Sequence, residues 1–138
     1  MTDDFFDLTK DVVLVTGGGG LIGPEVCRSI DRQCARVIVA EYDEKRGREV
    51  AEQLDRGEYV ALDITDSASV ESVCEHVFSE YGRLDGLVNL AYPHTEDYGQ
   101  PFESVEKDEL IENISLHLGG YYAMTKTAAL EMLKHDCE

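Results

Sequence analysis

Four consecutive glycines constrain the fold of this chain more than any other feature. They lie within residues 16–23, TGGGGLIG, which overlap the end of the apolar, β-branched run 11–16, DVVLVT. Such a run is typical of a strand that is buried on both faces of a sheet. Beyond the glycines, apolar residues recur at helical spacing as far as Ile30, and Pro24 stands where the first turn of a helix needs no N–H. The pattern predicts a strand, a glycine turn and a helix.

Strand and helix signals continue to alternate along the rest of the chain. Further strands are predicted at 36–40, 58–62 and 84–90. The segments that follow each strand carry apolar residues at helical spacing, and a loop at 91–103 precedes the last of them. Right-handed crossovers between parallel strands then predict an α/β fold, a Rossmann-type doubly wound sheet in three layers with strand order 3-2-1-4. We expect residues 1–138 to form one such domain, ending after the fourth strand and its helix.

The last segment is predicted to be one long helix with a single apolar stripe. The stripe consists of Ile111, Ile114, Leu118, Tyr121, Tyr122, Thr125, Ala129 and Met132. Gly119 and Gly120 weaken a helix locally, but they also allow a neighbouring segment to approach closely.

The glycine turn has the spacing of a dinucleotide-binding loop. It contains G-x-G-x-x-G at Gly18, Gly20 and Gly23, and T-G-x-x-G-x-x-G from Thr16 onward. Glycines there allow a tight turn, close approach of the backbone to a pyrophosphate, and close packing of helix on strand. The helix that follows presents free N–H groups and a favourable dipole to the phosphates. A P-loop would instead end in G-K-[ST], whereas Gly23 is followed by Pro24.

An acidic residue, Glu41, follows the second predicted strand directly, 18 positions after Gly23. A carboxylate at this place accepts hydrogen bonds from the ribose hydroxyls of adenosine and repels a 2′-phosphate. It therefore predicts NAD rather than NADP as the cofactor. Asp43 is the other acid nearby, and the alternative interpretation of both residues is a solvated turn.

Charge excludes several partner classes. There are 29 acidic and 12 basic residues, for a formal net charge of −17. A surface of this sign repels nucleic acid and anionic membranes. The acidic start of the chain and the lack of a long apolar run predict a cytoplasmic protein. None of Cys27, Cys34, Cys74 and Cys137 is spaced as a metal ligand pair, so we interpret them as structural thiols.

Two later elements carry a family resemblance. Leu62-Asp63-Ile64 follows the third strand and Asn89-Leu90-Ala91-Tyr92 follows the fourth. Together with TGGGGLIG they resemble the short-chain dehydrogenase/reductase family, which implies an oxidoreductase that moves hydride between nicotinamide and a hydroxyl or carbonyl carbon. The run from Ala91 to His94 is also similar to oxidoreductases of surface-sugar and flagellin-glycan gene clusters.

The resemblance assigns roles to these residues. Asp63 and Ile64 would hold the adenine, and Asn89 and Ala91 would border the ribose and nicotinamide. The alternative role of Asp63 is to cap the next helix, which Asp66 could do instead. Leu90 and Tyr92 depart from the family pattern of Asn and Gly. The predicted cofactor-binding residues are Gly17, Gly20, Leu21, Ile22, Gly23, Glu41, Asp63, Ile64, Asn89 and Ala91.

The last helix resembles the central interface helix of the family, which implies a homo-oligomer, most simply a dimer. In this register His117 takes the place of the catalytic Asn, with Asn113 one turn earlier. His117 could hold a water in a proton relay, or it could be a packed or solvated histidine.

Family members supply a catalytic Ser, and a Tyr and Lys four residues apart, in a later part of the domain. Tyr122 and Lys126 have that spacing, with Ser115 upstream, but the helical stripe runs through them unbroken, so we interpret them as a coincidental match. Two functions follow: the cofactor-binding part of an NAD-dependent oxidoreductase, or a module that binds a dinucleotide without chemistry.

Overall fold

Four parallel strands form the central sheet of the computed structural model, which describes residues 7–135. The strands are β1 (Val12–Thr16), β2 (Arg36–Glu41), β3 (Gly57–Ala61) and β4 (Gly86–Asn89). Their order is β3-β2-β1-β4, as the sequence predicted. The fourth strand is shorter than the expected 84–90, although Leu84 is fully buried before it.

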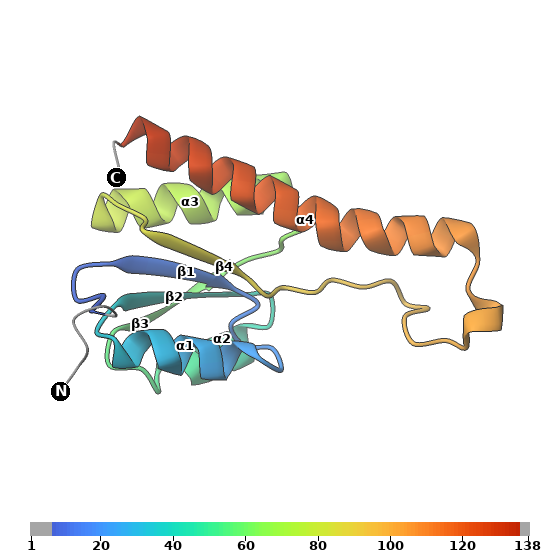
Figure 1. Ribbon diagram of the computed structural model, residues 1–138, viewed down its shortest axis with the longest axis horizontal. Helices are drawn as coiled ribbons and strands as arrows, with labels where there is room; N and C mark the ends of the chain where they lie inside the picture. The colour runs from blue at the N-terminus through green and yellow to red at the C-terminus, as the bar shows by residue number, and fades with distance from the viewer. Residues whose placement is uncertain (1–6, 136–138) are drawn as a thin grey trace.

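Helices cover both faces of this sheet. They are α1 (Gly23–Arg32), α2 (Glu44–Ala51), α3 (Ser67–Tyr81) and α4 (Lys107–Lys134), with a short 3-10 turn, η2 (Phe102–Ser104), inside the segment predicted as loop. Figure 1 shows α1 and α2 on one face and α3 and α4 on the other. Side chains cap two helices: Asp43 accepts from Arg46 N–H at 3.1 Å and Asp66 from Ala68 N–H at 3.0 Å. These caps orient the segments that leave β2 and β3.

The core has one part on each side of the sheet because successive strand residues point to opposite faces. In β1, Val13 and Val15 pack with the α1 and α2 side, while Val12 and Leu14 pack with the α3 and α4 side. β1 and β2 are covered on both faces, which explains their nearly continuous apolar sequences.

The long helix α4 is continuous through Gly119 and Gly120, as predicted, but its buried face differs from the predicted stripe. The buried positions are Gly120, Met124 and Ala128, whereas Ile111, Ile114, Leu118, Tyr122, Thr125 and Ala129 are exposed. The first half of the helix extends beyond the sheet, so no layer lies under it (Figure 1). At Gly120 the helix approaches Ile64, whose side chain would lie 3.2 Å from an added Cβ.

The cysteines behave largely as predicted. Cys27 and Cys74 are buried, and burial raises the pKa of each thiol to about 11, so both stay protonated at neutral pH. Cys34 is an exposed free thiol, and Cys137 lies outside the described residues. Between residues 7 and 135, no helix combines the length and the hydropathy of a membrane span.

Candidate functional site

A cleft opens at the carboxyl ends of the strands, where the order of the sheet reverses between β1 and β4. The chain leaves β1 toward α1 on one face, and after β3 it crosses to α3 on the other face before reaching β4. Ligands of open α/β sheets bind at such a switch point. The cleft has a volume of about 1040 Å³, at the upper end of the roughly 300–1,000 Å³ typical of ligand sites.

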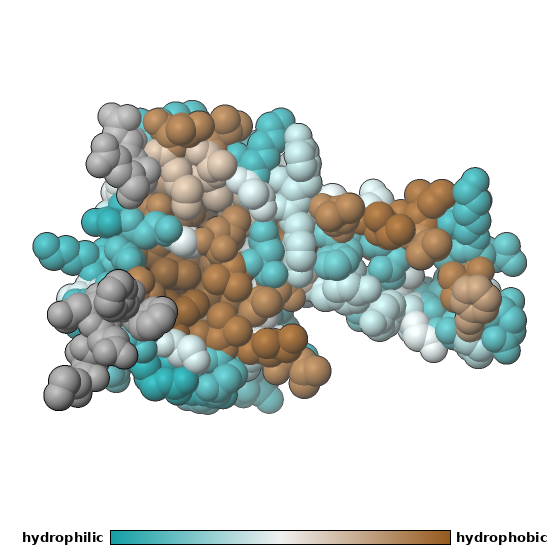
Figure 2. Space-filling view, in the orientation of Figure 1, coloured by the Kyte–Doolittle hydropathy of each residue, from teal (hydrophilic) through white to brown (hydrophobic). Residues whose placement is uncertain are grey.

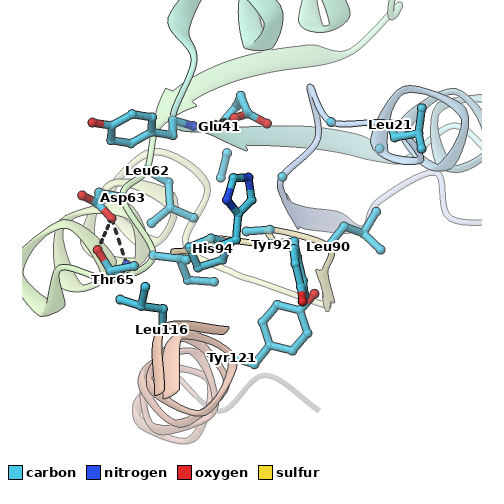
Figure 3. A pocket seen from close by; sticks show the side chains of 18 of the residues that line it. Leu21, Glu41, Leu62, Asp63, Thr65, Leu90, Tyr92, His94, Leu116 and Tyr121 are labelled. Carbon is cyan, nitrogen blue, oxygen red and sulfur yellow. Dashed lines mark hydrogen bonds between the residues drawn. The ribbon is translucent and has the colours of Figure 1, made fainter. Parts of the chain in front are cut away.

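The lining of the cleft contains nine of the ten predicted cofactor residues. They are Gly17, Gly20, Leu21, Ile22, Gly23, Glu41, Asp63, Ile64 and Ala91. Figure 3 shows Asp63 and Thr65 on one side of the cleft, Leu90, Tyr92 and Tyr121 on the other, and His94 between them. Residues from all four strand ends therefore meet in one cavity.

The glycine loop leaves no room for side chains where it turns. Gly17 has a φ of +69°, and a Cβ there would lie 2.5 Å from Ala91 N. A Cβ on Gly23 would lie 2.4 Å from Gly17 O, so α1 begins in direct contact with the loop. The N-cap of α1, Ile22, makes no side-chain cap. A turn of backbone without side chains, followed directly by a helix N-terminus, can accommodate a pyrophosphate group.

Glu41 is held beside the glycine loop by three backbone donors. Its Oε2 accepts from Gly19 N–H at 3.0 Å, and its Oε1 accepts from Tyr42 N–H at 2.9 Å and Asp43 N–H at 3.1 Å. A carboxylate has about four lone-pair positions, so Oε2 keeps acceptor capacity for a ligand hydroxyl. The carboxylate thus links the end of β2 to the loop after β1.

Asp63 lies on the rim of the cleft and does not cap α3. Its Oδ1 accepts from Thr65 N–H at 2.9 Å and from Thr65 Oγ1 at 2.6 Å, while Asp66 provides the cap. The structure therefore excludes the alternative interpretation of Asp63 as the helix cap. Ile64 is buried and lines the cleft next to it.

Asn89 is the predicted cofactor residue that does not line the cleft. Its Oδ1 accepts from Thr16 Oγ1 at 3.2 Å, and its Nδ2 donates to Thr125 Oγ1 at 3.0 Å. The same Thr16 hydroxyl, fully buried, accepts from Leu90 N–H at 3.2 Å. Asn89 and Thr16 together link the ends of β1 and β4, and Asn89 also connects them to α4.

Aromatic rings gather where the segment after β4 meets α4. Tyr92 contacts the ring of His117 edge-on at 4.3 Å between centroids, and His117 contacts Tyr121 at 4.6 Å. His94 stacks on Tyr98 at 4.9 Å. Loss of solvation, together with the neighbouring Tyr98, raises the pKa of Tyr92, so its phenol stays neutral at physiological pH. His117 thus packs among tyrosines instead of lining the cleft, and Asn113 Nδ2 donates to Thr95 Oγ1 at 3.4 Å.

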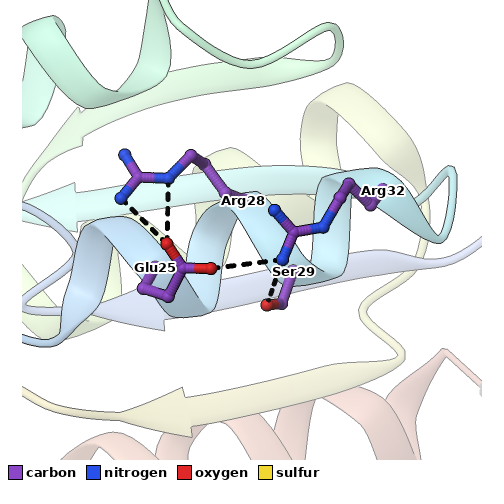
Figure 4. Close-up of polar contacts among 4 residues, drawn as sticks. All are labelled: Glu25, Arg28, Ser29 and Arg32. Atoms are coloured by element: carbon purple, nitrogen blue, oxygen red, sulfur yellow. Dashed lines mark hydrogen bonds and ion pairs between the residues drawn. The ribbon is translucent and has the colours of Figure 1, made fainter.

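No Lys or Arg belongs to the described lining of the cleft. Arg28, the first basic residue after the loop, donates to Glu25 on the exposed face of α1, with Nη2 3.1 Å from Oε2 (Figure 4). Arg46 has its Cβ beside Gly19, but its guanidinium pairs with Asp43 at 3.6 Å. The fixed charges of the cleft wall are the carboxylates of Glu41 and Asp63.

The sequence profile of the short chain dehydrogenase family matches residues 11–137, which include every element of the cleft. The chain belongs to this family. Short-chain dehydrogenases typically bind NAD or NADP together with a small-molecule substrate.

The chain is also similar to individual proteins along most of its length. L-fucose dehydrogenase from Bos taurus is 32% identical over 123 residues, covering 89% of this chain and 45% of the relative. Post-translational flagellin modification protein A from Campylobacter coli is 28% identical over 120 residues, covering 83% and 47%. The crystal structure of gox2181 superposes with a TM-score of 0.82 at 26% identity, covering 94% of this chain and 51% of that one. The chain spans about half the length of the relatives it matches.

The Tyr–Lys spacing in α4 does not place a short-chain dehydrogenase catalytic pair in the cleft. Tyr122 and Lys126 line a separate groove between α3 and α4, and the Lys126 Nζ lies 6.0 Å from the centre of the Tyr122 ring. This supports the interpretation of the match as a coincidence.

Several residues of the cleft were not identified from the sequence. They are Ala40, Tyr42, Leu62, Thr65, Leu90, Tyr92, Pro93, His94, Tyr98, Leu116 and Tyr121. Most of these residues adjoin a predicted site residue or follow β4. Their signal in the sequence is that they lie within a few residues of the carboxyl end of a predicted strand. Tyr98, Leu116 and Tyr121 carry no such signal, because only tertiary contacts bring them to the cleft.

Proposed function

We propose that this chain binds NAD(H) in the cleft and forms the cofactor-binding part of an oxidoreductase. The enzyme would exchange hydride between the nicotinamide and a hydroxyl or carbonyl carbon of a small molecule. The observation that carries the proposal is the position of Glu41, fixed at the end of β2 against the glycine loop of a family fold that uses such cofactors.

Different residues of the cleft would bind different parts of the cofactor. The backbone of the glycine loop and the start of α1 hold the pyrophosphate, and Glu41 accepts from the ribose of the adenosine. Asp63 and Ile64 border the adenine, and Ala91, supported by Asn89, borders the nicotinamide side. Bound NAD supplies the hydride acceptor, while the protein residues orient it and exclude water.

The charge of the cleft supports NAD over NADP. Glu41 would repel a 2′-phosphate, and no Lys or Arg in the described lining offsets that repulsion. Calorimetric titration of the 138-residue chain with NADH and NADPH tests this. We expect tighter binding of NADH. Tighter binding of NADPH would contradict the role of Glu41, and no binding of either cofactor would contradict the proposal as a whole.

His117 is proposed to take the place of the catalytic Asn of the family, and Asn113, one turn earlier in α4, is the second proposed catalytic residue. Of the two roles considered for His117, its ring contacts with Tyr92 and Tyr121 favour packing over a water relay. Packed in this way, His117 would fix the Tyr92 ring at the substrate end of the cleft.

A module that binds the dinucleotide without chemistry is the second candidate function. The observation that favours it is the location of Tyr122 and Lys126 outside the cleft, since the family uses a Tyr–Lys pair for proton transfer. An assay of NADH formation with a panel of sugar alcohols tests whether these residues catalyse the reaction by themselves. We expect no turnover by the 138 residues alone, and turnover that Tyr122→Phe abolishes would show that Tyr122 is catalytic.

The proposed setting is the cytoplasm, with the protein as a homodimer. Cys27, Cys34 and Cys74 are free thiols, which fits a reducing compartment.

A further inference from the structure

We infer that His94 supplies the cleft with a titratable positive charge, and that its imidazolium form binds the phosphates of the dinucleotide. This inference rests on the proposed binding of NAD, and it adds a dependence of the affinity on pH. It concerns a side chain in the segment after β4, which is separate from the backbone donors of the glycine loop and α1.

The fixed charge of the cleft has one sign. Its described lining contains two carboxylates, Glu41 at the end of β2 and Asp63 after β3, and no Lys or Arg. A helix N-terminus offers the equivalent of only about half a positive charge, whereas a diphosphate brings two negative charges. Affinity for such a ligand would therefore rise with any lining group that can become positive.

His94 is the one described lining residue that can become positive. The other titratable groups around it are carboxylic acids and phenols, which are negative or neutral in every protonation state. They are Glu41 and Tyr42 from the end of β2, Asp63 from the end of β3, Tyr92 and Tyr98 from the segment of His94 itself, and Tyr121 from α4. Histidine, in contrast, changes its charge between about pH 5 and pH 8.

The imidazole of His94 is held so that one of its nitrogens is left for a ligand. Its Nδ1 lies 3.1 Å from Thr95 O, and because a carbonyl oxygen only accepts, Nδ1 carries a proton. The ring stacks on Tyr98 with 4.9 Å between centroids. Among residues 7–135, Nε2 has no hydrogen-bond partner and the ring forms no ion pair with a carboxylate. When Nε2 is protonated, its N–H and the ring charge are both available to an anion.

His94 lies beside the proposed path of the pyrophosphate. The segment after β4 adjoins the glycine loop, since a Cβ on Gly17 would be 2.5 Å from Ala91 N. His94 follows three residues later and lines the same cleft as the loop. Figure 3 shows its ring in the middle of the cleft, between the two walls. A dinucleotide that extends from Glu41 to Ala91 would pass this ring.

Calorimetric titration with NAD at about pH 5.5 and about pH 8 tests the inference. The phosphates of NAD stay ionised over this range, so a change in charge comes from the protein. One close ion pair in water changes an affinity by about fivefold, and we expect the Kd to be lower by about that factor at the acidic pH. His94→Gln should remove this difference. His94→Lys should bind NAD at about pH 8 as tightly as the wild type does at the acidic pH, because its charge is fixed.

Two controls identify the protein group and the part of the ligand. His76→Gln removes a histidine of α3 that pairs with Glu58 at 2.6 Å and is not part of the described lining. This variant should keep the pH dependence of the wild type. Adenosine, which has no phosphate, should bind the wild type with the same Kd at both pH values. Circular dichroism at each pH checks that every variant keeps its fold, which the exposure of His94 favours.

Proton uptake gives an independent measurement. An anion bound to the imidazolium form favours protonation, so binding of NAD near the midpoint of the titration should take up protons. Calorimetry in two buffers that differ in ionisation enthalpy measures this uptake. We expect uptake by the wild type and by His76→Gln, and clearly less by His94→Gln.

The outcomes separate this inference from the proposed function. If the wild type binds NAD equally at both pH values, or if His94→Gln keeps the whole difference, only this inference is wrong. An equal pH dependence for adenosine would also contradict it, because the phosphates would then not be the group recognised. If the wild type binds NAD at neither pH, the proposed function fails, and the inference fails with it.

Discussion

At the scale of single residues, Glu41 has a structural role and a proposed recognition role. Its carboxylate accepts from Gly19 N–H and so fixes the loop that would hold the pyrophosphate. In the proposed binding mode, the same negative charge would face a 2′-phosphate. Substitutions of Glu41 therefore change both the absolute affinity for a cofactor and the discrimination between NADH and NADPH, and the two effects can be separated.

We expect Glu41→Ala to weaken binding of NADH and to narrow the ratio of the two dissociation constants by roughly fivefold to tenfold. Removing one repulsive charge pair at close range accounts for about 1 kcal/mol even in a watery environment. Glu41→Gln is the matched variant, because it keeps an acceptor for Gly19 and removes only the charge. Calorimetry with both cofactors measures the ratio, and an unchanged ratio in both variants would show that Glu41 does not contact the ribose.

Two glycines of the chain should respond to alanine in opposite ways. A Cβ on Gly23 would lie 2.4 Å from Gly17 O, so Gly23→Ala must displace the loop, at a cost of about 1–3 kcal/mol. Gly119 lies in α4 with no neighbouring atom within 4 Å of the added Cβ. Gly119→Ala should therefore stabilise the protein by about 0.5–1 kcal/mol. Urea denaturation measures both, and destabilisation by Gly119→Ala would mean that the exposed side of α4 is covered in solution.

At the scale of elements, a carboxylate ties the beginnings of β1 and β4 together. Asp85 Oδ2 accepts from Val12 N–H at 2.8 Å, and the carboxylate also pairs with the Arg83 guanidinium. Burial acts to raise the pKa of Asp85, but the hydrogen bonds from Arg83 and Val12 outweigh it, so the pKa lies below its ordinary value of 3.8. The ionised form is therefore the one that stabilises the fold.

Asp85→Asn should destabilise the protein by about 1.5–3 kcal/mol at pH 7, as expected for loss of charge-assisted hydrogen bonds. Because folding lowers the pKa of Asp85, its contribution is complete well above pH 3.8 and disappears as the pH falls through the lower, folded-state value. The difference between wild type and Asp85→Asn should thus be constant at neutral pH and shrink in acid. Chemical denaturation across a pH series measures it, and a difference that does not shrink at all as the pH falls would point to lost packing instead of lost charge.

At the scale of the whole molecule, an apolar arm extends from the body of the domain. Figure 2 shows hydrophobic side chains along the part that protrudes beyond the sheet. Exposed apolar residues of α4 there are Leu110, Ile111, Ile114 and Leu118. β4 also ends the sheet with one described neighbour, β1. Neighbouring exposed apolar residues of this kind favour an interaction surface.

We expect the chain to self-associate, most simply as a twofold dimer. The net charge of −17 opposes association, so added salt should strengthen it by screening. Sedimentation across a salt series measures this. Leu118→Ser should weaken association, whereas Leu133→Ser, exposed at the other end of α4, should not. A monomer at every salt and protein concentration would mean that neither β4 nor the arm forms an interface.

The sequence by itself determined the elements whose signals are local. The glycine turn, the strands β1 and β2 and the position of Glu41 depend on backbone conformation and burial over a few residues, and right-handed crossovers then allow one simple strand order. Nine of the cofactor residues predicted from these signals and from the family resemblance line the cleft. How each of them contacts a cofactor stays a prediction.

Only the tertiary structure decided which surfaces are covered. The periodicity of α4 predicts an apolar stripe, but the positions that the helix buries are Gly120, Met124 and Ala128, because that side lies over the body of the domain. The first half of α4 extends beyond the sheet. The contact of His117 with Tyr92 depends in the same way on segments that are distant in the chain. Local patterns specify how a segment folds, whereas the partner that covers it is set by long-range packing.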